Sequence, residues 1–161
     1  MTSCGKIGRR RVLATGAAFG AALALPARAQ EITSTAAARA DSAESDRIAA
    51  EFLNGVTPIA AGLVLEVPAL ADNPAAVPVR VHVTEAMTED SYCTDLILLA
   101  ERNPMPLACA FTFTAAAGSA DAAVRLRLIE SMKLRALARM SDGRVLEARA
   151  DTTVAAGGCG M

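Results

Sequence analysis

Alternation of apolar and polar residues is the dominant pattern in the middle of this 161-residue chain. Valines at positions 77, 79, 81 and 83 alternate with Pro78, Arg80 and His82, which predicts a strand over 77–83. The same period of two predicts a strand over 63–67. Residues 92–100 and 107–114 are apolar runs on either side of a proline-rich turn, so we expect them to pair as a β-hairpin.

Residues 122–140 allow two interpretations. They contain no glycine or proline and are rich in alanine, leucine and arginine, a composition that favours a helix. Parts of the segment nevertheless alternate, and Ser141-Asp142-Gly143 is a typical hairpin turn that leads into another alternating stretch over 144–151. We therefore predict strands in this region.

One helix is expected ahead of the strands, over residues 42–54. It begins at Ser42, a residue type favoured as N-cap, and ends at Asn54-Gly55. Six or seven short strands separated by turns favour an antiparallel β-sandwich. The predicted fold class is all-β with a short N-terminal helix, and the predicted domain spans residues 42–154.

The first 29 residues have the features of an export signal. Twin arginines at positions 9 and 10 precede an apolar stretch, and Ala27-Arg28-Ala29 is a typical cleavage site that leaves Gln30 as the new N-terminus. The apolar stretch is too short for a bilayer span of about 20 residues. Signals of this kind resemble those of the twin-arginine (Tat) pathway. We therefore expect a periplasmic protein without membrane insertion, with residues 30–41 as a disordered leader.

Charge excludes one class of partner. The whole chain has a formal net charge of −1, but the signal holds five of its 16 basic residues and none of its 17 acidic residues. The mature chain therefore has 11 basic against 17 acidic residues, a net charge of about −6. An acidic protein without tryptophan is unsuited to nucleic acid, which requires neutralised phosphates and stacking platforms.

Three cysteines remain after the signal, an odd number for an oxidising compartment. Cys93 and Cys109 lie on the two arms of the expected hairpin, and a disulfide between them would contribute about 3 kcal/mol. Because Cys109 shares parity with Phe111 and Phe113, a buried free thiol is the alternative. In either case Cys159 is left over.

Cys159 lies in residues 155–161, where every side chain is small until Met161. Gly157, Gly158 and Gly160 remove side-chain bulk, so a flexible arm of this kind could enter a narrow channel and visit several active sites. No lysine, arginine or histidine lies nearby to activate the thiol, so we expect a largely protonated thiol that depends on a partner. The alternative is a disordered tail that forms an intermolecular disulfide.

The end Ala156-Gly157-Gly158-Cys159-Gly160 resembles the Gly-Gly-Cys-Gly-Gly terminus of the SoxY family, the sulfur carrier subunits of the bacterial thiosulfate-oxidising (Sox) system. Other segments agree in order, including the Asn-Pro-x-Pro of residues 101–106 and the Ser-Asp-Gly that ends residues 137–143. The resemblance implies an immunoglobulin-like sandwich in which Cys159 holds the substrate covalently and Gly157, Gly158 and Gly160 form the arm. It implies a carrier, not an enzyme, with no cofactor of its own.

The resemblance also implies a set of partners. These are a SoxZ-like β-sandwich subunit in a heterodimer, a c-type cytochrome that couples thiosulfate to the thiol, a sulfate-releasing hydrolase and a sulfur dehydrogenase. The sequence departs from the family at Met161, which replaces a final glycine, at residues 72–75, and in its additional Cys93 and Cys109. Met161 leaves open a diverged carrier that serves another pathway.

Other candidate residues are fewer. His82, the only histidine, alternates with the inward valines and is expected on the surface. Cys159 and Met161 could offer soft ligands to Cu(I), which would make the chain a binding module, and a disulfide-tethered subunit is a further alternative. A row of basic residues is expected on one exposed face, either solvated and paired with acidic residues or forming a docking surface for an anionic substrate or acidic partner: Arg125, Arg127, Lys133, Arg135 and Arg139.

Overall fold

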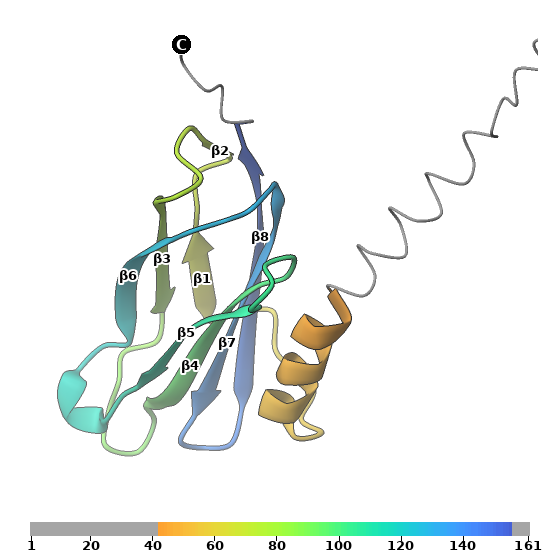
Figure 1. The fold of residues 1–161 in the computed structure, drawn as a ribbon. Coiled ribbons are helices and arrows are strands. Elements are labelled where there is room, and N and C mark those ends of the chain that lie inside the picture. The colour runs from red at the N-terminus through yellow and green to blue at the C-terminus, as the bar shows by residue number, and fades with distance from the viewer. Residues whose placement is uncertain (1–41, 156–161) are drawn as a thin grey trace, which may run out of the picture.

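The computed structural model describes residues 42–155, which form a two-sheet β-sandwich with one α-helix over residues 42–53 and a short 3-10 helix, η1 (Ala115–Ala117) (Figure 1). A three-stranded sheet has the order β1-β3-β6, and a five-stranded sheet has the order β2-β8-β7-β4-β5. The predicted all-β sandwich with an N-terminal helix is confirmed. The strands are β1 (Leu63–Glu66), β2 (Leu70–Ala71), β3 (Val77–Val83), β4 (Cys93–Ala100), β5 (Leu107–Thr112), β6 (Asp121–Leu126), β7 (Met132–Met140) and β8 (Val145–Val154).

The strand predictions hold where the alternation is clearest. The four valines of β3 are at most 7% exposed and face the other sheet, while Arg80 on the same strand faces outward. The ambiguous segment forms strands β6 and β7, as predicted. A hairpin turn that contains Gly143 joins β7 to β8. Gly143 has φ of 87°, a left-handed conformation that glycine adopts at little cost. Burial between two sheets therefore outweighs helix propensity in this segment.

The helix covers the outer face of the larger sheet. Its Ala49 is 1% exposed and belongs to a second, smaller core with Ile97 and Leu99 of β4, Leu137 of β7 and Val145 of β8. Asn54, with φ of 46°, and Gly55, with φ of 81°, end the helix. Figure 1 shows the helix beside β7 and β8, on the side away from β1, β3 and β6. The middle of the five-stranded sheet, on β4 and β7, is thus buried on both faces.

The expected row of exposed basic residues does not exist as one surface. Arg125 lies on β6 in the small sheet, whereas Lys133, Arg135 and Arg139 lie on β7 in the large sheet. The helix covers this face of β7, so Arg135 is only 7% exposed. Arg139 donates a hydrogen bond to the Phe52 carbonyl oxygen and lies 4.8 Å from the centre of the Phe52 ring. The helix therefore covers two of the five residues, Arg135 and Arg139, while Arg125, Arg127 and Lys133 are exposed.

Part of the expected pairing with acidic residues is present. The Nε atom of Arg135 lies 2.5 Å from Oε1 of Glu147, whose side chain is 13% exposed. The two atoms are not aligned as a hydrogen bond, so the contact is an ion pair held by proximity. Asp46 of the helix lies 3.6 Å from the same guanidinium. This charge cluster links the helix to β7 and β8.

The expected disulfide between Cys93 and Cys109 is wrong, because both are free thiols. The hairpin itself forms, but its register places Cys109 opposite Leu98, five residues along β4 from Cys93. At about 3.3 Å per residue the two Cα atoms are separated by about 16 Å. A disulfide requires Cα atoms within about 7 Å. The alternative, a buried free thiol at Cys109, holds in part: Cys109 is a free thiol but only half-buried, whereas Cys93, for which no such alternative was given, is fully buried.

Several predictions fall on residues outside the described range. These are the signal peptide over 1–29, the leader over 30–41, and the tail residues Gly157, Gly158, Cys159, Gly160 and Met161. Within residues 42–155, no helix is long and apolar enough to cross a membrane.

Candidate functional site at the root of the C-terminal arm

The last residues of β8 are held from both sides. On one side β2 runs parallel to β8, pairing Leu70 with Thr153, and Ala155 donates its backbone N–H to the Ala71 carbonyl at 3.0 Å. On the other side the Val154 N–H donates to Oγ of Ser131 at 2.9 Å. Figure 1 shows β2 beside the end of β8, at the point where the chain leaves the sandwich. The root of the predicted arm is therefore a fixed point of the fold.

A buried hydroxyl adds to this anchorage. Thr152 is 3% exposed, and its Oγ1 donates to the Pro68 carbonyl at 2.8 Å. Residues 68–71, which include β2, thus form a strap that follows β8 as far as Ala155. Cys159 is the fourth residue after Ala155, so chain length limits its Cα atom to within about 14 Å of the root at 3.3–3.6 Å per residue.

The two cysteines inside the sandwich are unsuited to carry a substrate. Burial raises the pKa of the Cys93 thiol to about 11, and the nearby Asp95 carboxylate adds to the shift. Burial also raises the pKa of Cys109. Because the thiolate is the reactive form, both thiols are less reactive than an ordinary exposed cysteine.

A hollow of about 430 Å³ lies next to the arm root. Its wall includes the end of β8, the start of β7 and the segment after β4. This wall carries positively charged, negatively charged and hydroxyl side chains. Burial raises the pKa of the Glu101 carboxyl in this wall, against the lowering effect of nearby Arg149, Arg135 and Lys133. The lining residues are Ser42, Glu101, Arg102, Ser131, Met132, Lys133, Asp151, Thr152 and Thr153.

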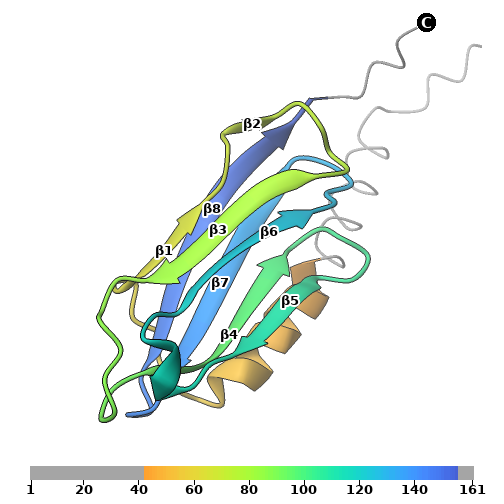
Figure 2. The same cartoon turned by 90° about the vertical axis from the view of Figure 1, so that its left-hand side faces the viewer.

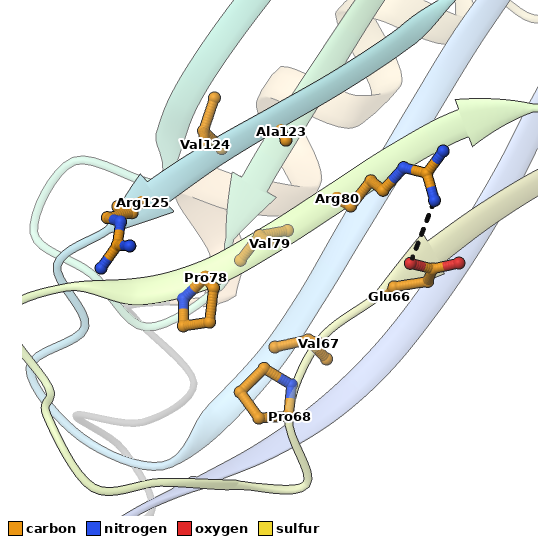
Figure 3. Close-up of a pocket in the computed structure, with 9 residues that line it drawn as sticks. All are labelled: Glu66, Val67, Pro68, Pro78, Val79, Arg80, Ala123, Val124 and Arg125. Carbon is orange, nitrogen blue, oxygen red and sulfur yellow. Dashed lines mark ion pairs between the residues drawn. The ribbon is translucent and has the colours of Figure 1, made fainter.

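A second hollow, of about 510 Å³, lies on the small sheet (Figure 3). Figure 3 shows Arg80 of β3 and Glu66 of β1 pointing toward one another, with Arg125 of β6 at the opposite side of the hollow. Arg80 is 3.7 Å from Glu66 and makes a closer pair, at 2.6 Å, with Asp121. Since none of the nine lining residues carries a thiol, hydroxyl, amine or imidazole, this hollow offers no nucleophile for covalent sulfur chemistry.

His82 lies on β3 opposite Asp121 of β6 and is partly exposed, as expected of its outward parity. No group of three or more His, Cys, Asp or Glu side chains that could hold a metal ion occurs within residues 42–155. The possible soft-metal pair of Cys159 and Met161 lies outside that range.

Sequence reasoning missed the residues that fix the arm root. Ser131 and the strap around Pro68 are remote from β8 in the sequence, and β2 has only two residues. A two-residue strand has no detectable alternation. Their role depends on a parallel long-range pairing that local patterns do not record.

Comparison with known proteins assigns the family. The family model described as "SoxY: Sulfur oxidation protein SoxY" matches residues 49–159, more than two thirds of the chain. The chain belongs to the SoxY family. Membership of the SoxY family implies a role as a sulfur carrier in sulfur oxidation, and SoxY proteins are carriers, not enzymes.

Solved structures agree with the SoxY fold. The sulfur carrier protein SoxY from Chlorobium limicola f thiosulfatophilum matches with a TM-score of 0.54 and 23% identity, covering 68% of this chain and 94% of that chain. The superoxide reductase (neelaredoxin) from Ignicoccus hospitalis matches with a TM-score of 0.51 and 21% identity, covering 58% and 80%. At these identities the likeness concerns the fold alone. No curated protein sequence matches the chain.

Proposed function

We propose that this SoxY-family protein carries the sulfur intermediates of thiosulfate oxidation as covalent adducts of Cys159. The observation that carries the proposal is the fixed end of β8, which holds the root of an arm whose only thiol is Cys159. Family membership supports the same role. Cys93 and Cys109 do not compete for this role, because burial keeps both thiols protonated.

Loading is an oxidation. The Cys159 thiol and thiosulfate form an S–S bond, giving a cysteine S-thiosulfonate, and release one proton and two electrons. The electrons pass to a c-type cytochrome partner, which supplies the oxidant. Because no basic side chain lies within residues 155–161, the partner also removes the proton.

Release is a hydrolysis. Water attacks the terminal sulfonate sulfur, the bond between that sulfur and its neighbour breaks, and sulfate and a proton leave. Cys159 then holds a persulfide, which is the substrate for a sulfur dehydrogenase. A hydrolase with a dinuclear metal centre supplies the catalytic groups, so the carrier contributes the thiol and its placement.

The proposal includes a stable partner and a compartment. The partner is a SoxZ-like β-sandwich subunit that forms a heterodimer with this chain. SoxY-family proteins are typically periplasmic. The twin arginines at positions 9 and 10 direct export through the Tat pathway, and Gly157, Gly158 and Gly160 keep the arm slim.

The test is the intact mass of the protein purified from cells grown on thiosulfate, before and after a reductant, with peptide mapping. We expect reductant-sensitive sulfur adducts on the peptide that contains Cys159. A Cys159→Ser variant should lose them, while a Cys109→Ser variant, which removes a half-buried thiol, should keep them. An unmodified Cys159 after growth on thiosulfate would contradict the proposal, as would copper bound through Cys159 and Met161.

A further inference from the structure

Large apolar side chains are exposed mainly at the end of the sandwich from which the arm leaves. Of the six that the described residues expose, four lie at this end, and only Val56 and Ile59 lie elsewhere. Leu70 is on β2, which pairs with the end of β8. The other three lie on the opposite flank of β8 and are named here the apolar patch: Met105, 80% exposed, Ile129, 56% exposed, and Leu107, 42% exposed.

Hydrogen bonds hold the apolar patch in place. Asn103 donates from Nδ2 to the Arg127 carbonyl at 2.9 Å and accepts the Ile129 N–H on Oδ1 at 3.2 Å. Arg102 and Glu130 form an ion pair at 2.8 Å between the same two segments. The loop over 101–106 is thus joined to the loop over 127–131. These contacts fix the two loops to each other. Met105 and Ile129 are therefore exposed on ordered loops.

One member of the apolar patch, Ile129, lies next to the arm root, whereas Leu107 on β5 is level with Arg149 of β8. Ile129 is two residues from Ser131, whose Oγ accepts the Val154 N–H. Two residues span at most about 7 Å. Figure 2 shows the loop after β6 and the loop between β4 and β5 on the same side of the end of β8. The same loop therefore fixes the arm root and presents Ile129.

The length of the chain limits where a partner can bind. The Cα atom of Cys159 can reach no farther than about 14 Å from Ala155, because it is only four residues along the chain. An enzyme that acts on a group attached to Cys159 must place its active site within this distance of the arm root. Its surface must then cover the end of the sandwich, including exposed apolar side chains that would otherwise remain in contact with water.

We propose that the apolar patch of Met105, Leu107 and Ile129 is the surface on which an enzyme acting on Cys159 docks while it takes the arm. The partner has an apolar rim beside the entrance to its active site. This inference rests on the proposed carrier function and adds the surface that the partner recognises. Burial of Met105 and Ile129 against such a rim stabilises the complex, because it removes exposed apolar surface from water.

The test is the loading of Cys159 by the purified thiosulfate-coupling cytochrome, with thiosulfate saturating and the carrier concentration varied. The carrier is the complete mature protein with its partner subunit. The double variant Met105→Gln/Ile129→Thr should raise KM for the carrier at least tenfold with little change in kcat. The control Val56→Thr alters a side chain that is 40% exposed outside the arm-root end, and should leave KM unchanged.

Three results would overturn the inference. KM of the double variant within twofold of wild type would show that the enzyme docks elsewhere. Loss of the SoxZ-like subunit from the double variant would assign the patch to the permanent interface. Failure of the wild-type protein to be loaded at Cys159 would refute the carrier function itself. Normal loading of the double variant with an unchanged KM would refute only the docking surface. Equal reaction of Cys159 with a maleimide in all variants is the check that the arm remains accessible.

Discussion

The two free thiols of the sandwich allow a sharp test of the strand register. The perturbation is Cys93→Ser, Cys109→Ser and both together, in a chain that starts at Gln30 and carries Cys159→Ser. Cys93 is fully buried, so its serine variant places a hydroxyl in the core, which costs about 1–3 kcal/mol if it lacks a full partner. The Asp95 carbonyl, 3.5 Å from the Cys93 Sγ, is the acceptor that would reduce this cost.

Cys109→Ser should lower the free energy of unfolding by less than about 1 kcal/mol. Cys109 is half-buried on an edge strand, so a hydroxyl there reaches water. The two sites are about 16 Å apart along the register, so their effects should add within about 0.5 kcal/mol. A disulfide would give a different pattern. Each single variant and the double variant would then lose the same amount, about 3 kcal/mol.

The assay is urea unfolding followed by circular dichroism, with and without reductant, in a double-mutant cycle. Titration of thiols in denaturant should find two in the Cys159→Ser parent before reduction. Equal losses in all three variants, or a midpoint that falls on adding reductant to the parent, would refute the register and with it the argument from distance.

Three further predictions concern the arm root and the arm tip. Thr152→Val removes a buried donor to the Pro68 carbonyl, so it should lower the free energy of unfolding by about 1–2 kcal/mol and speed amide exchange at residues 153–155, as followed by hydrogen–deuterium exchange. Glu101→Gln should raise the free energy of unfolding at pH 7 but not at pH 3. Burial raises the pKa of the native carboxyl, so its contribution to stability is present below the unfolded pKa and is lost as pH rises through the folded value; equal effects at both pH values would contradict this. Met161→Gly restores a slim tip and should raise kcat/KM for hydrolytic release of sulfate, whereas a lower value would indicate that partners recognise the thioether.

Alternation predicted the strands well wherever one face of a strand is buried and the other is wet. β3 is the best case, because its valines face the core and Arg80 faces solvent. The same rule misplaced Arg135. Alternation indicates two faces, but it does not reveal that a helix covers the outer one, and the apolar residues of 42–54 alone do not say which strand they contact.

The register of strand pairing was the second feature that the sequence did not predict. The sequence predicted the hairpin of β4 and β5, but the bulge at Leu98 and Leu99 and the turn length decide that Cys109 lies opposite Leu98 and not near Cys93. A shift of a few residues has no signature in the hydrophobic pattern when most side chains of β4 are buried. The candidate site divides in the same way: Cys159 was recognised from its glycine neighbours, whereas Ser131 and Asn103 acquire their roles only from long-range hydrogen bonds.

The fixed end of β8 has a kinetic consequence for a carrier. With its root held at Ala155, the Cys159 thiol is confined to a small volume, and once a partner has docked, the thiol meets the active site at an effective concentration on the order of millimolar or above. Recognition of the tip itself can then be weak. A carrier that serves several enzymes in turn benefits from this arrangement. The sandwich surface provides the binding to each enzyme, and the weakly bound tip leaves each active site as soon as the chemistry is complete.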